Sequence, residues 1–457
     1  MTRKPYEPPA LIPHRPDLVN AFGRTTPRQV VSEIDGCAVA DLATRYGSPL
    51  FVFSERTLRA RIAEFRDAFR DRYSKVRFAW SYKTNYLDAV CGIFHQEGWD
   101  AEVVSELEYE MARRIGIPGS RIICNGAYKP VSWCTRASRD GALIQIDHFD
   151  EIETLAGVVR SRPKPLPVGL RLNVRVDSLG TPWERFGFAL DNGEALDAVL
   201  RVLEVPKLEL QGIHCHLGTF ITQPDIYRVA TQKLCAFARQ IEQFVGQPLR
   251  FINLGGGLPS NNTLVTAYGE SSPPPAADFA ESICSAMRDA FADRKNPPEL
   301  WLENGRSLVD SCGSLISTVS GTRRLASGER GLVMDAGLNV LYTAHWYAHS
   351  VVPAQEVKGQ QESTTLHGPL CMNIDTLRRS ILLPPLEVGD RIVIRPVGAY
   401  NVTQWMQFSQ LRPAVVMIGE DGEVSLIRRA ETFADVKGPE CLPDRYKPER
   451  PPEREAE

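Results

Sequence analysis

From residue 50 onward the sequence alternates between short β-rich runs and longer segments with helical spacing of apolar residues. After the first run, at residues 50–53, apolar residues at 58, 62, 65 and 69 have the spacing of a helix that covers a sheet. Strand-like runs then recur at residues 76–82, 100–105, 121–124, 142–147, 168–174, 211–216, 251–254 and 299–303. Repeated strand and helix predict a parallel sheet, and about eight such units predict that it closes into a (β/α)8 barrel of the TIM type. An open doubly wound sheet is the alternative topology.

The pattern changes after about residue 312. Short strand candidates follow one another without comparable helices, which predicts a second, mainly antiparallel β domain. The expected organisation is a partly disordered N-terminal arm at 1–30, the barrel domain at 31–312, the β domain at 313–442 and a charged, proline-rich tail at 443–457. The first segment of the barrel range could instead join the β domain.

Composition excludes several classes of protein. Charged residues are 24% and hydrophobic residues 43% of 457, with a net charge of -3, as in a soluble globular protein. The sequence contains no basic block that would indicate nucleic-acid binding, and no apolar run that approaches the roughly 20 residues needed to span a bilayer. The N-terminus lacks the apolar segment of a signal peptide, and ten cysteines without a CxxC pair form neither a disulfide framework nor a zinc knuckle. We expect a cytoplasmic protein without nucleic-acid or membrane partners.

A lysine follows the strand candidate at residues 76–82, which is apolar or aromatic at nearly every position. Such a strand is buried on both faces, so Lys83 lies where a buried strand should end. A lysine that leaves the core with its ammonium in solvent is the ordinary explanation. The alternative is a functional amine at the mouth of the barrel, where catalytic side chains gather at the C-terminal ends of strands.

Two further motifs follow predicted strands. The triple glycine at 255–257 can expose backbone N–H groups to a phosphate, although a tight turn also uses glycines. Glu303 and Arg306 belong to the motif ENGR after the next strand. The carboxylate could hold a cationic ring nitrogen and the guanidinium a phosphate, whereas a local Glu–Arg ion pair is the simpler alternative.

His214 and His216 end another predicted strand, where residues two apart point the same way. A metal site is one interpretation, although the sequence offers no obvious third ligand. An imidazole packed on an aromatic cofactor and a satisfied interior histidine are the others. Cys371 follows a Gly-Pro turn in the predicted β domain, where a cysteine is ordinarily a small hydrophobic residue.

Taken in order, these motifs resemble a known family. They are Tyr82-Lys-Thr-Asn85, HCHLGT at 214–219, GGGLP at 255–259, ENGR at 303–306, GPLC at 368–371 and GAY at 398–400. The order resembles the pyridoxal-phosphate decarboxylases that act on diaminopimelate, ornithine, lysine or arginine. That family combines an alanine-racemase-like barrel with a β domain. Through GIHCHLG, MDAGLN and LRP, the closer resemblance is to diaminopimelate decarboxylase.

The resemblance implies pyridoxal 5'-phosphate (PLP) as the cofactor and a homodimer with shared active sites that acts on a small amino-acid-like substrate. Lys83 would hold PLP as a Schiff base, His216 would stack on the ring and Glu303 would bind the ring nitrogen. Cys371 would enter the active site of the partner subunit and return a proton to the α-carbon. Lys83 and Cys371 are thus the expected catalytic residues. The implied cofactor-binding residues are Lys83, His216, Thr219, Gly255, Gly256, Gly257, Glu303, Gly305, Arg306 and Tyr400.

The chain departs from diaminopimelate decarboxylases at positions that contact the far end of the substrate. Thr343 stands where those enzymes have an arginine, and Met372 where a glutamate follows the cysteine. An arginine aimed at a distal carboxylate supplies specificity that threonine cannot. We therefore predict a decarboxylase whose substrate is not diaminopimelate and carries a less charged side group. The expected substrate-pocket residues are Thr343, His345, Tyr347 and Met372.

Two other functions stay open at this point. An amino-acid racemase would use the same barrel and lysine, and release of carbon dioxide separates decarboxylation from racemisation. A catalytically silent PLP-binding homologue is the second alternative, against which the intact Lys83, Glu303 and Cys371 argue. No metal is expected.

Overall fold

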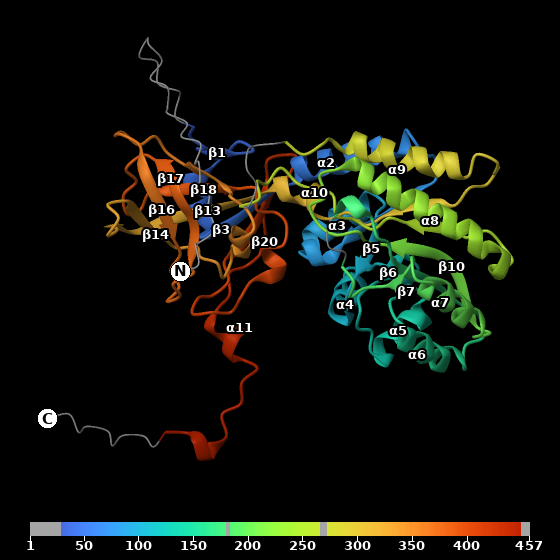
Figure 1. Ribbon diagram of the computed structural model, residues 1–457. Helices are drawn as coiled ribbons and strands as arrows, with labels where there is room; N and C mark the ends of the chain where they lie inside the picture. Colours follow the sequence, from blue (N-terminus) through green and yellow to red (C-terminus); the bar gives the residue numbers. More distant parts are fainter. Residues whose placement is uncertain (1–28, 180–182, 266–271, 449–457) are drawn as a thin grey trace, which may run out of the picture.

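The computed structural model describes residues 29–179, 183–265 and 272–448. The predicted N-terminal arm therefore lies outside the described residues apart from its last two positions, as does the predicted tail beyond residue 448. Two large sheets organise the described residues, a barrel surrounded by helices and a second sheet beside it (Figure 1).

Eight parallel strands form the barrel. They are β4 (Val76–Ser81), β5 (Asp100–Val103), β6 (Ile122–Cys124), β7 (Leu143–Ile146), β8 (Leu166–Asn173), β10 (Leu208–Cys215), β11 (Phe251–Asn253) and β12 (Glu299–Leu302). Because β12 pairs with β4 and β8 pairs with β10, the sheet is closed, and short β9 (Phe188–Ala189) pairs with β8 at its rim. The predicted (β/α)8 barrel is confirmed, and the open doubly wound alternative is wrong.

Amphipathic helices cover the barrel. They are α2 (Glu55–Arg70), α3 (Asp88–Gln96), α4 (Glu106–Arg114), α5 (Val131–Asp140), α6 (Phe149–Val159), α7 (Glu194–Leu203), α8 (Pro224–Val245) and α9 (Ala276–Ala290). Helix α2 illustrates why these segments fold this way. The hydroxyl of Ser54 accepts a hydrogen bond from the Thr57 N–H and so caps its first turn. The side chains that α2 buries are those of the predicted pattern, Leu58, Ile62, Phe65 and Phe69.

The second sheet is built around β13 (Gly313–Arg324). This strand pairs antiparallel with β14 (Arg330–Met334), β18 (Arg391–Arg395) and β3 (Leu50–Ser54). The remaining strands are β15 (Ser350–Pro353), β16 (Glu362–His367), β17 (Thr376–Leu383), β19 (Ala414–Ile418) and β20 (Val424–Arg428). The predicted β domain is confirmed, and it is mixed, because β14 pairs in parallel with β16 and β3 with β19.

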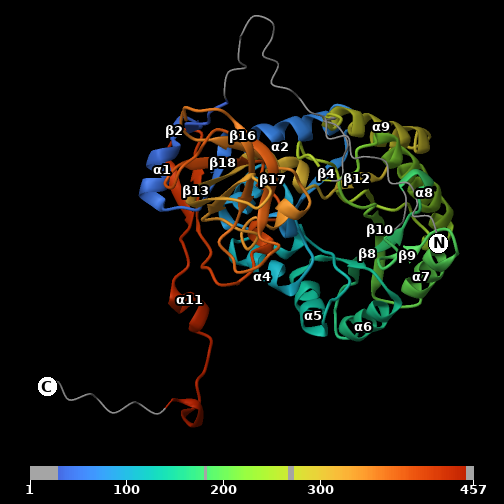
Figure 2. The same cartoon turned by 60° about the vertical axis from the view of Figure 1, so that its left-hand side comes forward.

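The other α-helices and strands of the described residues are short. They are β1 (Glu33–Ile34), β2 (Cys37–Ala38), α1 (Val39–Tyr46), α10 (Arg306–Val309) and α11 (Phe433–Lys437). Both views place α11 on a C-terminal segment that runs away from the two sheets (Figures 1 and 2). Among the helices of the described residues, none has both the length and the apolar character that a membrane crossing requires.

Candidate active site

Strand register brings Lys83 to a buried carboxylate at the C-terminal end of the barrel. Ser81 on β4 and Glu102 on β5 are partners in the parallel ladder, and Lys83 lies in the 3-10 turn directly after β4. Its Nζ is 2.6 Å from Oε2 of Glu102, an oxygen that also accepts a hydrogen bond from the Ser81 hydroxyl. The Lys83 side chain is 35% exposed, whereas that of Glu102 is fully buried. The amine therefore turns to a buried carboxylate and not simply into solvent.

The charged form of the Lys83 amine is favoured. Burial lowers the pKa of Lys83, but the charge of Glu102, followed by Tyr400 and Glu303, outweighs burial and raises the pKa above its ordinary value of 10.5. A free amine at this position is therefore protonated at neutral pH.

Glu303 follows β12 and is 5% exposed. Asn253 donates to its Oε1 at 2.6 Å, Asn125 donates to its Oε2 at 2.9 Å, and Nε2 of His214 lies 3.3 Å from the same Oε2. Burial would raise the pKa of Glu303, but His214, Lys83 and Asn253 together hold the pKa below its usual range. A carboxylate that stays charged in a buried site can hold a protonated ring nitrogen.

The triple glycine after β11 forms a loop that side chains would block. Gly255 and Gly257 have φ values of +61° and +103°, in the left-handed region that favours glycine. A Cβ on Gly256 would collide with the carbonyl oxygen of Glu303, and one on Gly257 would lie 2.5 Å from that of Gly218. The glycines therefore let the loop pack closely against neighbouring backbone, and the Gly255 N–H donates to Oδ1 of Asn253 at 2.9 Å.

Arg306, at the start of α10, is 7% exposed. Its guanidinium carbon lies 4.5 Å from the ring centre of Tyr400 and 5.2 Å from that of Tyr347. Its Nη2 donates to the Thr219 hydroxyl at 3.4 Å, whereas its buried Nη1 has no hydrogen-bond partner within the described residues. Among the described residues, Arg306 and Glu303 form no ion pair with each other, because Glu303 faces His214 and Arg306 contacts Thr219. A buried cation with an unused donor fits an anionic ligand group.

His216 lies against the same glycine loop. The Gly256 N–H donates to its Nδ1 at 3.3 Å, and the ring of Trp183 lies 5.7 Å from the imidazole. Burial, followed by the charge of Lys83, lowers the pKa of His216 to about 3. The ring is therefore neutral at physiological pH and offers a flat, uncharged face.

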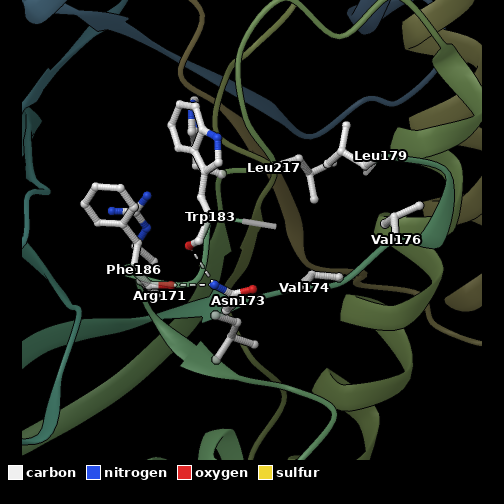
Figure 3. A pocket seen from close by; sticks show the side chains of 10 residues that line it. Arg171, Asn173, Val174, Val176, Leu179, Trp183, Phe186 and Leu217 are labelled. Atoms are coloured by element: carbon white, nitrogen blue, oxygen red, sulfur yellow. Dashed lines mark hydrogen bonds between the residues drawn. The ribbon is translucent and has the colours of Figure 1, made fainter. Parts of the chain in front are cut away.

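A pocket opens beside His216 at the end of β8 (Figure 3). Asn173 donates to the carbonyl oxygens of Trp183 and Phe186 at 2.9 and 3.0 Å and so fixes the loop that carries both aromatic rings. Arg171 lies over the Phe186 ring at 4.4 Å and pairs with Asp147 at 3.2 Å. The aromatic side chains of this loop are thus held at the barrel mouth by polar groups.

The second sheet supplies Tyr400 to the region of Lys83. The Tyr400 N–H donates to the carbonyl oxygen of Thr84 at 2.8 Å, and the Asn85 amide donates to that of Gly398 at 3.0 Å. Tyr400 has a φ of +60°, which costs a non-glycine residue energy and persists only where the surroundings enforce it. The GAY motif is therefore fixed directly against the turn that carries Lys83.

Thr343 is 1% exposed, and its hydroxyl is already engaged. It donates to Oδ1 of Asn401 at 2.9 Å and lies 2.9 Å from Nε2 of His349. Threonine at this position thus packs into a polar cluster of the second sheet. The other expected substrate-pocket residues are buried Tyr347, exposed His345 and half-buried Met372.

Cys371 has an exposed, free thiol in the loop between β16 and β17. Within the described residues, no hydrogen bond or ion pair joins it to the residues around Lys83. The loop itself is fixed, because buried Asp375 accepts hydrogen bonds from the N–H groups of Leu338 and Leu370, both at 2.8 Å. The structure thus presents the thiol outward on a well-defined loop.

Sequence reasoning missed the polar residues that hold this site, Glu102, Asn125, Asn253 and Asp375. Three of them lie in or directly after apolar strands, where a polar side chain signals a buried partner. The metal interpretation of the two histidines finds no support in the part of the chain that the structure describes, where no group of three or more possible ligands gathers. His214 faces Glu303 instead.

Residues 55–310, more than half of the chain, match the family model described as pyridoxal-dependent decarboxylase, pyridoxal binding domain. The chain belongs to the pyridoxal-dependent decarboxylases. The family resemblance is therefore confirmed, and so are PLP as the cofactor and amino-acid decarboxylation of the ornithine, arginine, lysine and diaminopimelate type as the class of activity.

Named relatives match almost the whole of this pyridoxal-dependent decarboxylase. Diaminopimelate decarboxylase of Methanocaldococcus jannaschii is 28% identical over 424 residues, which cover 90% of this chain and 95% of that protein. Diaminopimelate decarboxylase of Bacillus subtilis is 28% identical over 420 residues, or 88% and 94% of the two chains. The crystal structure of the M. jannaschii enzyme in complex with L-lysine superimposes with a TM-score of 0.84 at 27% identity and covers 91% of this chain and 97% of that one.

The residues at the barrel mouth fit the chemistry of PLP. Lys83 offers an amine, and Glu303 offers a buried charged carboxylate. The loop at 255–257 accommodates no Cβ at any of its three positions, and Arg306 keeps one buried donor unused among the described residues. These features suit the aldehyde, the ring nitrogen and the phosphate of the cofactor, respectively.

Proposed function

We propose that Lys83 anchors PLP, that Glu303 binds the ring nitrogen, and that the glycine loop at 255–257 and Arg306 hold the phosphate. The observation that carries this assignment is one hydrogen-bonded network at the barrel mouth, in which Lys83 contacts Glu102 and Asn125 connects Glu102 to Glu303. When bound, PLP supplies an electron sink for the electron pair that remains after the α-carboxylate leaves as carbon dioxide.

The surrounding residues have defined roles in this proposal. Glu102 accepts a hydrogen bond from the free Lys83 amine and keeps that amine oriented. Neutral His216 offers its ring face to the cofactor, because burial prevents its protonation at neutral pH. Gly305 leaves room for the Thr84 hydroxyl, with which a Cβ would collide, so the turn that carries Lys83 can approach the ENGR motif. Thr219 and Tyr400 orient Arg306.

We assign the return of a proton to the α-carbon to Cys371 of a partner subunit. A thiol is a competent general acid, and this thiol is exposed on a loop that Asp375 fixes. The assignment requires a homodimer in which each active site combines Lys83 of one subunit with the thiol of the other.

We further propose that the substrate is not diaminopimelate. Thr343 stands where diaminopimelate decarboxylases have an arginine, and its hydroxyl is engaged by Asn401 and His349. The rings of Tyr400 and Tyr347 lie 4.5 and 5.2 Å from the guanidinium carbon of Arg306. Aromatic side chains at this position favour a larger and less charged side group than diaminopimelate carries.

The absorbance spectrum of the purified holoenzyme tests this proposal. A panel of amino acids is added one at a time, and each is scored for a change in the cofactor band, for carbon dioxide release and for the chirality of the remaining substrate. Carbon dioxide release with a stoichiometric amine product is expected. Loss of optical rotation without carbon dioxide would show racemisation instead.

A further inference from the structure

We propose that Asn125 is a positioning residue that couples the carboxylate beside Lys83 to the carboxylate assigned to the ring nitrogen. The inference rests on the assignment of Lys83 and Glu303 in the proposed function. It adds Asn125, which determines how strongly Glu102, beside Lys83, and Glu303 influence one another.

The geometry of Asn125 is that of a bridge. The residue follows β6 and is 4% exposed. Its Nδ2 lies 2.9 Å from Oε1 of Glu102 and 2.9 Å from Oε2 of Glu303. A side-chain amide nitrogen carries two protons, so it can donate one to each carboxylate. Both oxygens are then acceptors, which requires that neither carries a proton at that position.

The other hydrogen bonds of the two carboxylates are separate, whereas the charge of Lys83 acts on both and His214 faces Glu303 at 3.3 Å. Oε2 of Glu102 receives Lys83 and Ser81, whereas Oε1 of Glu303 receives Asn253. Among the hydrogen bonds of the described residues, the amide of Asn125 is the one that both carboxylates share. It is therefore the group through which a change at one carboxylate can reorient the other.

Two buried anions held by one donor respond jointly to charge. Loss of the shared donor removes from each carboxylate a hydrogen bond that favours its charged form. Burial strengthens the effect, since a fully desolvated network polarises along its hydrogen bonds. A change of charge on Glu102 should thus alter the proton affinity of the cofactor held by Glu303, and this influence should depend on Asn125.

A double-mutant cycle on the holoenzyme tests the inference. The pH midpoint of the absorbance band of bound PLP is measured for Glu102→Gln, Glu303→Gln and the combined variant, in the native background and in Asn125→Ala. The expected result is a departure from additivity of about threefold or more in proton affinity in the native background, and a clearly smaller departure in Asn125→Ala, where only the charges still couple the two carboxylates. Ser81→Ala and Asn253→Ala are matched controls, because each removes a donor from one carboxylate only.

Additive shifts in the native background, or non-additivity that persists undiminished in Asn125→Ala, would overturn the inference. If Asn125→Ala does not fold, as judged by thermal melting, Asn125→Leu replaces it, because leucine is close to asparagine in shape and has no hydrogen-bond donor in its side chain. Borohydride reduction followed by peptide mapping tests the underlying assignment separately. Label on Lys83 with additive shifts rejects only the coupling, whereas label on another lysine rejects the assignment and the inference together.

Discussion

The Nζ of Lys83 lies 2.6 Å from Oε2 of Glu102, a fully buried carboxylate on the neighbouring strand. The contact follows from the parallel register of β4 and β5. This register pairs Glu102 with Ser81, which lies two positions before Lys83. A lysine placed this way is held as a group of the barrel mouth, and its amine is available to a carbonyl compound once it gives up a proton.

Replacement of this lysine should abolish covalent cofactor binding. Lys83→Ala is expected to lose the absorbance band of bound PLP and roughly 10³-fold or more of the decarboxylation rate, because no amine replaces the nucleophile. Spectroscopy and carbon dioxide release measure the two effects. Lys437→Ala, at an exposed lysine of the C-terminal segment, is the control and should match the parent enzyme. A normal cofactor band in Lys83→Ala would refute the anchor.

Glu303→Gln should separate binding from catalysis. Glutamine keeps the shape of the side chain, but it has no charge with which to hold a protonated ring nitrogen. We expect PLP to remain bound and the turnover rate to fall by roughly 10²-fold or more. Glu299→Gln, at a more exposed position on the preceding strand β12, should leave turnover unchanged. Equal rates for Glu303→Gln and the parent would exclude a role for the carboxylate in the chemical step.

The glycine loop gives a prediction about cofactor affinity. In Gly256→Ala the new Cβ would collide with the carbonyl oxygen of Glu303, so the loop must shift. The dissociation constant of PLP is expected to rise by about tenfold or more, as measured by titration of the apoenzyme. Gly157→Ala lies in α6 where a Cβ would meet nothing within 4 Å, and its affinity should stay unchanged. An unchanged affinity in Gly256→Ala would argue against the phosphate assignment.

His349 should make the protein sensitive to acid. Burial lowers its pKa from 6.5 to about 3 in the folded protein, so the unfolded chain binds a proton first as the pH falls. The contribution of neutral His349 to the free energy of unfolding is therefore fully present above pH 6.5 and is lost as the pH falls toward 3. Between pH 8 and pH 5 the loss is about 2 kcal/mol.

The measurement is the free energy of unfolding at these two pH values. In His349→Gln the difference between pH 8 and pH 5 should be about 2 kcal/mol smaller than in the parent protein. Exposed His345→Gln is the control, and it should preserve the parent difference. An equal pH dependence in His349→Gln and the parent would contradict a neutral buried imidazole.

The loop of Cys371 provides a test that leaves the cofactor site intact. Asp375→Asn weakens the hydrogen bonds to the N–H groups of Leu338 and Leu370, so the thiol is held less firmly. We expect about a tenfold fall in kcat with unchanged PLP affinity, and a larger fall in Cys371→Ser. Asp421→Asn, in an exposed turn where Asp421 likewise accepts a backbone hydrogen bond, should have no effect. Full activity in Cys371→Ser would remove the thiol from the mechanism.

The sequence predicts the fold and part of the site for a physical reason. Alternating apolar strands and amphipathic helices allow few topologies, and Lys83 and Glu303 each follow a buried strand directly, so their position at the barrel mouth can be inferred. Glu102 and Asn125 escape prediction because their partners are set by strand register between distant segments. Strand β3 likewise pairs with β13 and β19, which follow it only after the whole barrel.

The engaged hydroxyl of Thr343 also lay beyond sequence reasoning. The resemblance predicts that Thr343 replaces an arginine, but only the structure places this threonine between Asn401 and His349. The position is therefore packed by its neighbours, and a ligand carboxylate would have to compete with an existing hydrogen-bonded cluster.

The rate of carbon dioxide release from meso-diaminopimelate, compared with that from a panel of amino acids without a distal carboxylate, decides whether diaminopimelate is a substrate of this enzyme. Purified holoenzyme is expected to decarboxylate at least one member of the panel and to leave diaminopimelate essentially unchanged. Turnover of diaminopimelate at an ordinary enzymatic rate, on the order of 1 s⁻¹ or faster, would contradict the account.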